Sequence, residues 1–183
     1  NANIASVNYH FGSKEALLAS DLERRLEPIN ELRLHHLDVI EAKYRDDQLP
    51  LQEVVRAFLM PPFELRKQWG AQGQTFFRVL GRVHGETSKE FRTTFMQQFD
   101  AVLQRFFGAF QRALPDAVPG DLAWHMLFLT GSMAFTMSWG EALKERDENL
   151  NRTSEDVIEL LTAYVSAGMQ SSLNTPKKKR TQE

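Results

Sequence analysis

Four hydrogen-bonding side chains near the start of the chain have the types and spacing of a helix that reads DNA. They are Ser6, Asn8, Tyr9 and His10. Hydroxyl and amide groups can bond to base edges in the major groove. The chemistry that this pattern predicts is recognition of double-stranded DNA. An ordinary surface helix with one polar side accounts for the same pattern.

The residues around these side chains predict a short helix, a tight turn and a long helix. Asn3 is a good N-cap for a helix that runs to about His10, and Gly12 can adopt the positive φ that ends it. Ser13 can then cap the long helix that follows. Such a short polar helix is suited to be the second helix of a helix-turn-helix.

The string Val7-Asn-Tyr-His-Phe-Gly-Ser-Lys-Glu-Ala-Leu-Leu18 resembles the end of the DNA-recognition helix in TetR-family transcriptional regulators. The resemblance implies that Asn8 and Ser6 read base edges and that Lys14 binds phosphate at the start of the next helix. Two helices that precede this point in the family are absent from the chain as written. We therefore expect specific DNA binding of the natural protein and not of this chain alone.

The rest of the chain predicts an all-α, TetR-like fold. No alternating strand pattern or hairpin dipeptide stands out, and apolar residues recur at helical spacing between Gly and Pro breakers. Three parts are expected: the C-terminal part of the DNA-binding head in residues 1–20, a ligand-binding and dimerisation domain in residues 21–173, and a basic tail in residues 174–183. The Lys177–Arg180 run of the tail is most simply a solvated terminus.

Two long apolar segments near the end of the body predict a homodimer. The segment from Asp121 to Arg146 is apolar on more than one side, so it needs cover on more than one side. The last helix has a single apolar stripe, and two such helices from each of two chains would form a four-helix interface. The interface residues predicted on this basis are Met126, Leu129, Met133, Leu160, Leu161, Tyr164 and Gly168.

The body also resembles the fatty-acid-responsive PsrA-type branch of the TetR family. The resemblance lies in residues 76–81, 124–138 and 163–169, and it implies an apolar effector such as a long-chain fatty acid or an acyl-CoA. The chain has 13 phenylalanines, which either fill the core or line a tunnel for such a ligand. The predicted ligand-binding residues are Phe76, Phe77, Arg78, Arg82, His84, Phe106, His125, Phe128 and Phe135.

Two arginines in this set stand one helical turn apart. Arg78 and Arg82 could hold a carboxylate at the border of an apolar tunnel, or could pair with acidic side chains at the surface. Arg66 is a further candidate for the same role, and His125 is as well explained as a hydrogen-bonded core histidine.

Composition and motifs argue against other classes of protein. The chain has no cysteine, a net charge of −2, and no apolar run long enough to span a membrane. It also lacks phosphate-binding loops, nucleophile elbows and metal-ligand clusters. We therefore expect no enzyme activity, no cofactor, no metal, no membrane partner, and a cytoplasmic location.

Together these observations predict a homodimeric transcriptional repressor that binds operator DNA and is released by an apolar effector. The alternatives are a helical lipid carrier or another helical-bundle protein, such as an enzyme, that has no role at DNA.

Overall fold

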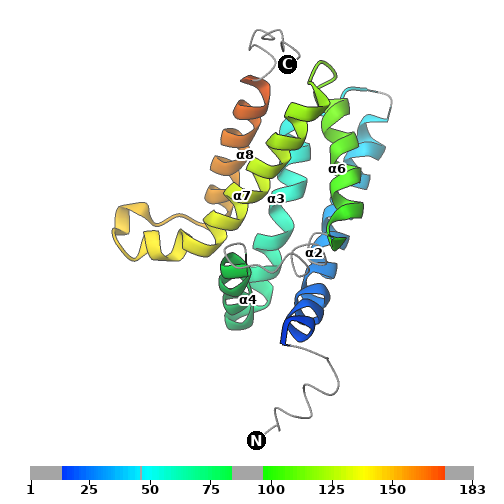
Figure 1. Ribbon diagram of the computed structural model, residues 1–183. Coiled ribbons are helices and arrows are strands. Elements are labelled where there is room, and N and C mark those ends of the chain that lie inside the picture. Colours follow the sequence, from blue (N-terminus) through cyan, green and yellow to red (C-terminus); the bar gives the residue numbers. More distant parts are fainter. Residues whose placement is uncertain (1–13, 46, 84–96, 172–183) are drawn as a thin grey trace, which may run out of the picture.

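The computed structural model of the protein (Figure 1) describes residues 14–45, 47–83 and 97–171, without the side chains of 14–19, 21 and 78–83. Within these ranges the chain forms six α-helices and one 3₁₀ helix, and it contains no strand. The all-α prediction is therefore confirmed.

The first helix, α2 (Lys14–Tyr44), is the longest in the described chain and contains Pro28. Its buried side chains recur every three or four residues and form one stripe: Leu22, Leu26, Ile29, Arg33, Leu37 and Ile40. This spacing places the stripe on one side of the helix, where it packs on α3 and α6.

Helix α3 (Leu51–Gln68) contacts α2, α4, α6 and α8 and is central to the bundle. Gly70 separates it from α4 (Gly70–Val83), and its φ of +55° lies in the left-handed region that favours glycine. Gly73 lets the two helices approach closely, because a Cβ there would stand 2.7 Å from the carbonyl oxygen of Arg66.

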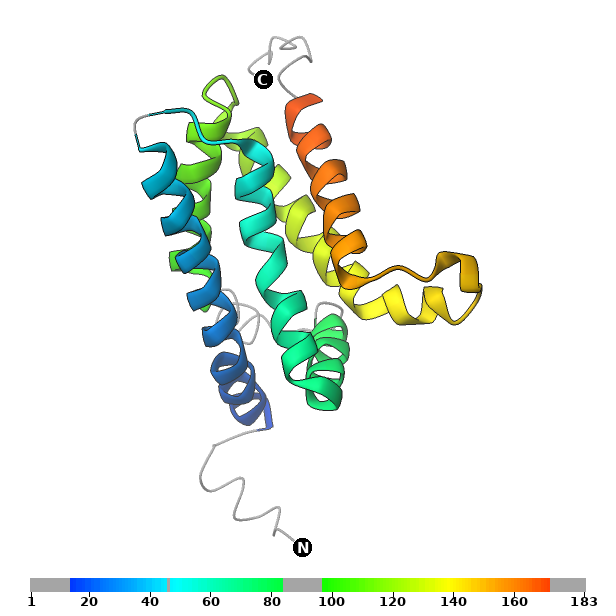
Figure 2. The same cartoon turned by 180° about the vertical axis from the view of Figure 1, so that it is seen from behind.

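The remaining helices complete two layers. They are α6 (Asp100–Ala113), α7 (Pro119–Lys144), the 3₁₀ helix η1 (Glu148–Leu150) and α8 (Ser154–Ser171). Figure 2 shows α3 between α2 and α8 in one layer, with α6 and α7 behind them. The end of α7 and η1 project from the side of the bundle.

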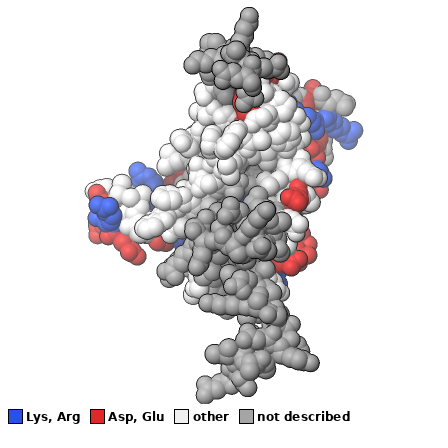
Figure 3. All heavy atoms as spheres, in the orientation of Figure 1, with Lys and Arg blue, Asp and Glu red and all other residues white. Residues whose placement is uncertain are grey.

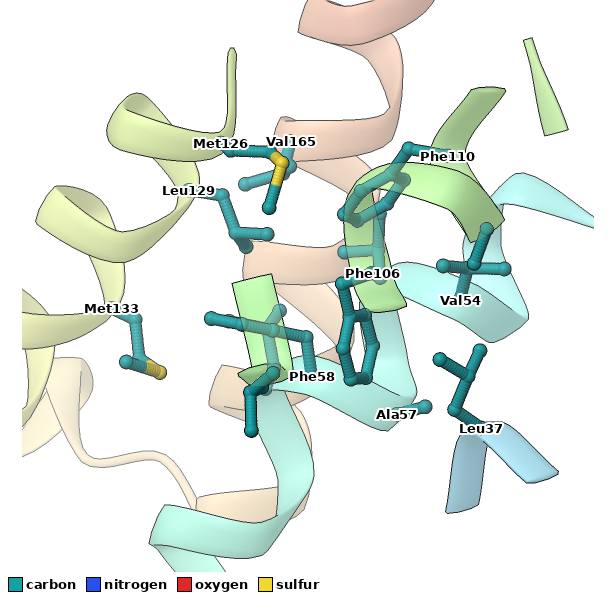
Figure 4. Close-up of a cluster of buried hydrophobic side chains, with 14 of the residues drawn as sticks. Leu37, Val54, Ala57, Phe58, Phe106, Phe110, Met126, Leu129, Met133 and Val165 are labelled. Atoms are coloured by element: carbon teal, nitrogen blue, oxygen red, sulfur yellow. The ribbon is translucent and has the colours of Figure 1, made fainter. Parts of the chain in front are cut away.

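The core lies between these layers (Figure 4). Phe58 on α3 meets Phe106 on α6 edge to face, with 5.1 Å between the ring centroids, and both side chains are almost completely buried. Met126, Leu129 and Met133 close the core from α7. The mixture of aromatic rings with flexible methionines fills the space between helices that cross at different angles.

Surface ion pairs join helices that are distant in sequence. Arg105 on α6 bonds to both Asp38 and Glu41 on α2, each at 2.7 Å. Arg56 on α3 pairs with Glu155 on α8. These exposed pairs orient the helices but contribute little free energy compared with the apolar core.

Replacing Phe106 by alanine should lower the free energy of unfolding by about 3–5 kcal/mol, because the cavity left at the centre of the core cannot collapse fully. Urea unfolding at a fixed protein concentration measures the loss. Val39→Ala, at an exposed position of α2, is the control and should change stability by no more than about 0.5 kcal/mol. Equal effects of the two substitutions would contradict this description of the core.

Candidate functional site

Helix α7 is apolar on two opposite sides. Leu122, Met126, Leu129, Met133 and Met137 form one stripe, and all five are buried in the core. A second stripe, half a turn away, is exposed to solvent and contains Trp124, Phe128, Gly131, Phe135 and Trp139. A helix with two apolar sides needs a neighbour on each side.

The exposed stripe of α7 continues onto α8, and we call the two together the α7–α8 face. Its large side chains are 53–70% exposed: Trp124, Leu127, Phe128, Phe135, Trp139, Leu143, Leu160 and Tyr164. Phe135 and Trp139 stack, with 6.0 Å between their ring centroids. Figure 3 shows uncharged surface over these helices, with charged groups gathered at the projecting end of α7 and along the edges. Apolar patches of this kind mark interaction sites.

The structure divides the predicted interface residues into two groups. Leu160, Tyr164 and Gly168 lie on the exposed side of α8 and belong to the α7–α8 face. Met126, Leu129, Met133 and Leu161 instead lie in the core of the protomer, and this assignment is corrected. Both stripes of α7 are apolar, so the pattern alone did not distinguish the inward one. The aromatic stripe of Trp124, Phe135 and Trp139 was omitted from the predicted interface.

Small residues leave room on the α7–α8 face. A Cβ added at Gly131 or at Gly168 would meet no atom of the chain within 4 Å. Packing inside the protomer therefore does not require glycine at either position. Both positions would allow close approach by another helix.

A groove lies at the edge of this face, between the end of α7, η1, the start of α8 and α3. Its volume is about 350 Å³, and its apolar walls include Phe63, Leu143, Leu150, Leu160 and Tyr164. Arg66 and Lys144 line it as well, and both pair with Glu141, at 3.2 and 3.3 Å. The candidate anchor Arg66 is therefore engaged by a carboxylate of the protein itself.

A reciprocal cap holds the start of α8 beside the groove. The backbone N–H and the hydroxyl of Thr153 both donate to Asp156, and the N–H of Asp156 donates to the Thr153 hydroxyl oxygen. The hydrogen bonds from Thr153 hold the pKa of the Asp156 carboxyl below its ordinary value. The cap thus fixes where α8 begins, and with it the position of Leu160 along the helix.

The predicted ligand-binding residues that the structure describes lie in three different places. Phe76 and Phe77 pack with Trp69 where α3 meets α4, with 5.9 and 6.4 Å between their centroids and that of Trp69. Phe106 is in the central core. Phe128 and Phe135 are on the outer face, with half-buried His125 next to Phe128.

Other predicted site residues lie outside the part of the chain that the structure describes. These are Ser6, Asn8, Tyr9, His10 and His84, together with the side chains of Lys14, Arg78 and Arg82. The structure describes α2 from Lys14 onward, and the turn predicted before it lies outside the described residues.

A search of the described residues finds no group of three side chains that could hold a metal ion. None of the helices described is long and apolar enough to cross a membrane.

Comparison with known proteins places this bundle in context. The family model described as "Tetracyclin repressor-like, C-terminal domain" matches residues 56–168, which run from α3 into α8 and make up more than half of the chain. No curated protein matches the sequence.

Proposed function

Because this chain belongs to the tetracyclin repressor-like C-terminal domain family, we propose that it forms the effector-binding and dimerisation part of a homodimeric transcriptional repressor. The observation that supports this proposal most directly is the α7–α8 face. The family match supports a second copy of the same chain as the partner that covers this face.

The proposed dimer pairs α7 and α8 of one protomer with the same helices of its partner. A two-fold axis would bring each α7–α8 face onto its own copy, so that one surface serves both protomers. Leu160 and Tyr164 supply apolar area on α8, and Gly131 and Gly168 allow the helix axes to approach. The result is a four-helix interface.

DNA binding is proposed to reside in the residues that precede α2. Ser6, Asn8, Tyr9 and His10 would face the major groove, and Lys14 would bind phosphate at the start of α2. In a dimer the two heads would contact half-sites about 34–36 Å apart. An apolar effector, such as a long-chain fatty acid or acyl-CoA, would favour a body conformation in which this spacing is lost.

Gly131→Trp should shift the protein from dimer to monomer in sedimentation velocity. The indole would block close approach at the middle of the α7–α8 face, while the open space around Gly131 leaves the fold of the protomer intact. Gly108→Trp on α6 is the matched control, because a Cβ there also meets nothing and the position lies off the face. A dimer that survives Gly131→Trp unchanged would rule out this interface.

Protein expressed from the complete natural reading frame should bind the DNA upstream of its own gene and release it when sodium oleate is added. Fluorescence anisotropy measures both steps. Lys14→Ala should weaken binding of all sequences and lower the salt slope by about 1, whereas Asn8→Ala should cost about 1–3 kcal/mol at the operator only.

Lys144→Ala, which removes a lysine from the body, is the control for charge and should leave DNA binding unchanged. Failure of the complete protein to bind this DNA, together with binding of oleate, would favour the lipid-carrier alternative.

A further inference from the structure

Arg33 is the largest side chain that the described core buries almost completely. It lies on the inward stripe of α2 between Ile29 and Leu37, and only 2% of its surface is exposed. Arginine is rarely buried to this extent unless it is paired. The position interrupts an otherwise apolar stripe, a signal that is visible in the sequence once the stripe is known.

Among the described residues, the contacts of the Arg33 guanidinium come from three helices and are all with neutral groups. Its Nε donates to the carbonyl oxygen of Phe58 at 2.9 Å, and its Nη1 donates to Oδ1 of Asn30 at 3.1 Å. Its Nη2 lies 3.4 Å from the sulfur of Met133, which is a weak acceptor. The guanidinium carbon also stands 4.1 Å from the centroid of the Phe58 ring.

These contacts leave the guanidinium only partly satisfied. It has five N–H donors, and three of them have acceptors among the residues that the structure describes. One of those acceptors is the Met133 thioether. The two remaining donors, and the donor that faces sulfur, belong to the two terminal nitrogens, which are the groups that bind a carboxylate in the forked arrangement.

The positive charge of Arg33 has no carboxylate partner in the described part of the chain. Burial lowers the pKa of the guanidinium to about 9, so it stays protonated at neutral pH. By contrast, Arg56, Arg66 and Arg105, which are all more exposed, each pair with a carboxylate. Arg33, the buried arginine, is therefore the one of these four without a carboxylate partner among the described residues. The attraction between opposite charges is strongest in such a region of low dielectric. A neutral side chain of similar volume would fill this position without the desolvation cost.

We propose that the Arg33 guanidinium is the anchor for the carboxylate of the effector, which is a free fatty acid. This inference rests on the proposed function, because it assigns the group that binds the effector there. The carboxylate takes the terminal nitrogens of Arg33 and displaces the sulfur of Met133, whose flexible side chain can move aside. One carboxylate neutralises one buried guanidinium.

The surroundings of Arg33 determine the rest of the ligand. Phe58 on α3 and Met133 on α7 both contact Arg33, and the neighbouring core, part of which Figure 4 shows, is apolar. These surroundings match an alkyl chain in polarity, and a bound chain would take the place of core side chains such as that of Met133. A coenzyme A thioester does not match them, because it has no free carboxylate and its phosphates would have to remain in water. The site therefore selects the acid over the thioester.

The location also couples binding to the orientation of α2. Arg33 is on α2, Met133 is on α7, and Asn30 beside it donates from Nδ2 to the carbonyl oxygen of Gln98 before α6 at 3.0 Å. Replacing the Arg33–Met133 contact with an Arg33–carboxylate contact changes how α2 is held against α7. Because α2 begins at Lys14, this change reaches the proposed DNA-binding residues.

The test compares an acid with its uncharged counterpart on chain stripped of lipid. Calorimetric titration of the wild type should show at least tenfold tighter binding of oleate than of oleyl alcohol. Arg33→Met should reduce this preference to less than twofold, without weakening the binding of oleyl alcohol. Arg66→Met, at the candidate anchor already paired with Glu141, is the matched control and should keep the preference. Oleoyl-CoA should bind the wild type no more tightly than the alcohol does.

A second measurement needs no variant and decides the question if Arg33→Met fails to fold. The chemical shift of the carboxyl carbon of [1-¹³C]oleate bound to the wild type, followed against pH, should give a carboxyl pKa well below the ordinary range. The described groups that contact Arg33 are neutral, so the guanidinium is the charge that the carboxylate faces. An ordinary pKa, an acid preference that survives Arg33→Met, or tighter binding of oleoyl-CoA than of oleate would overturn the inference. Each of these results would leave the regulator proposal intact, since operator binding and dimerisation are measured separately.

Discussion

The structure depends on one constraint: α7 is apolar on two opposite sides, and its own chain covers one of them. The Met126–Met133 stripe belongs to the core side of α7, which packs against α4, α6 and α8, while Trp124, Phe135 and Trp139 face solvent. Exposed aromatic rings at this density are unfavourable in water, so a partner that covers them is favoured. The dimer that we propose would cover them through the same helix that closes the core.

A second constraint is the buried charge at Arg33. Exposed arginines at Arg56 and Arg105 tie the helices together through carboxylates, and water screens their charges. Among the described residues, the acceptors of Arg33 are a carbonyl, an amide and a thioether, in a region with almost no exposure to water. The core accepts a charge that its own described groups do not neutralise. Such a site is stable enough to fold and is improved by an anionic ligand.

The two constraints meet on α7. Met133 contacts Arg33 on the inner side of the helix, and Phe135, two residues later, belongs to the outer face. A small movement of α7 at Met133 therefore changes the α7–α8 face. The same movement changes the contact between α2 and α7. Packed cores transmit such movements because they deform little. One buried contact is in this way placed to affect both the proposed subunit interface and the end of α2 that we propose to lie next to the DNA-binding residues.

Much of this protein was determined by local sequence alone. Helical periodicity identified the all-α class, Gly70 marked the boundary between α3 and α4, and Lys14 was expected at the start of a long helix. These features depend on residues close together in the chain. Only the tertiary structure decided which apolar stripe of α7 turns inward, since periodicity is the same for both. It also separated Phe106 from Phe128 and brought Arg33 against Met133, 100 residues away. Such contacts depend on how the helices pack, and no local pattern encodes that packing.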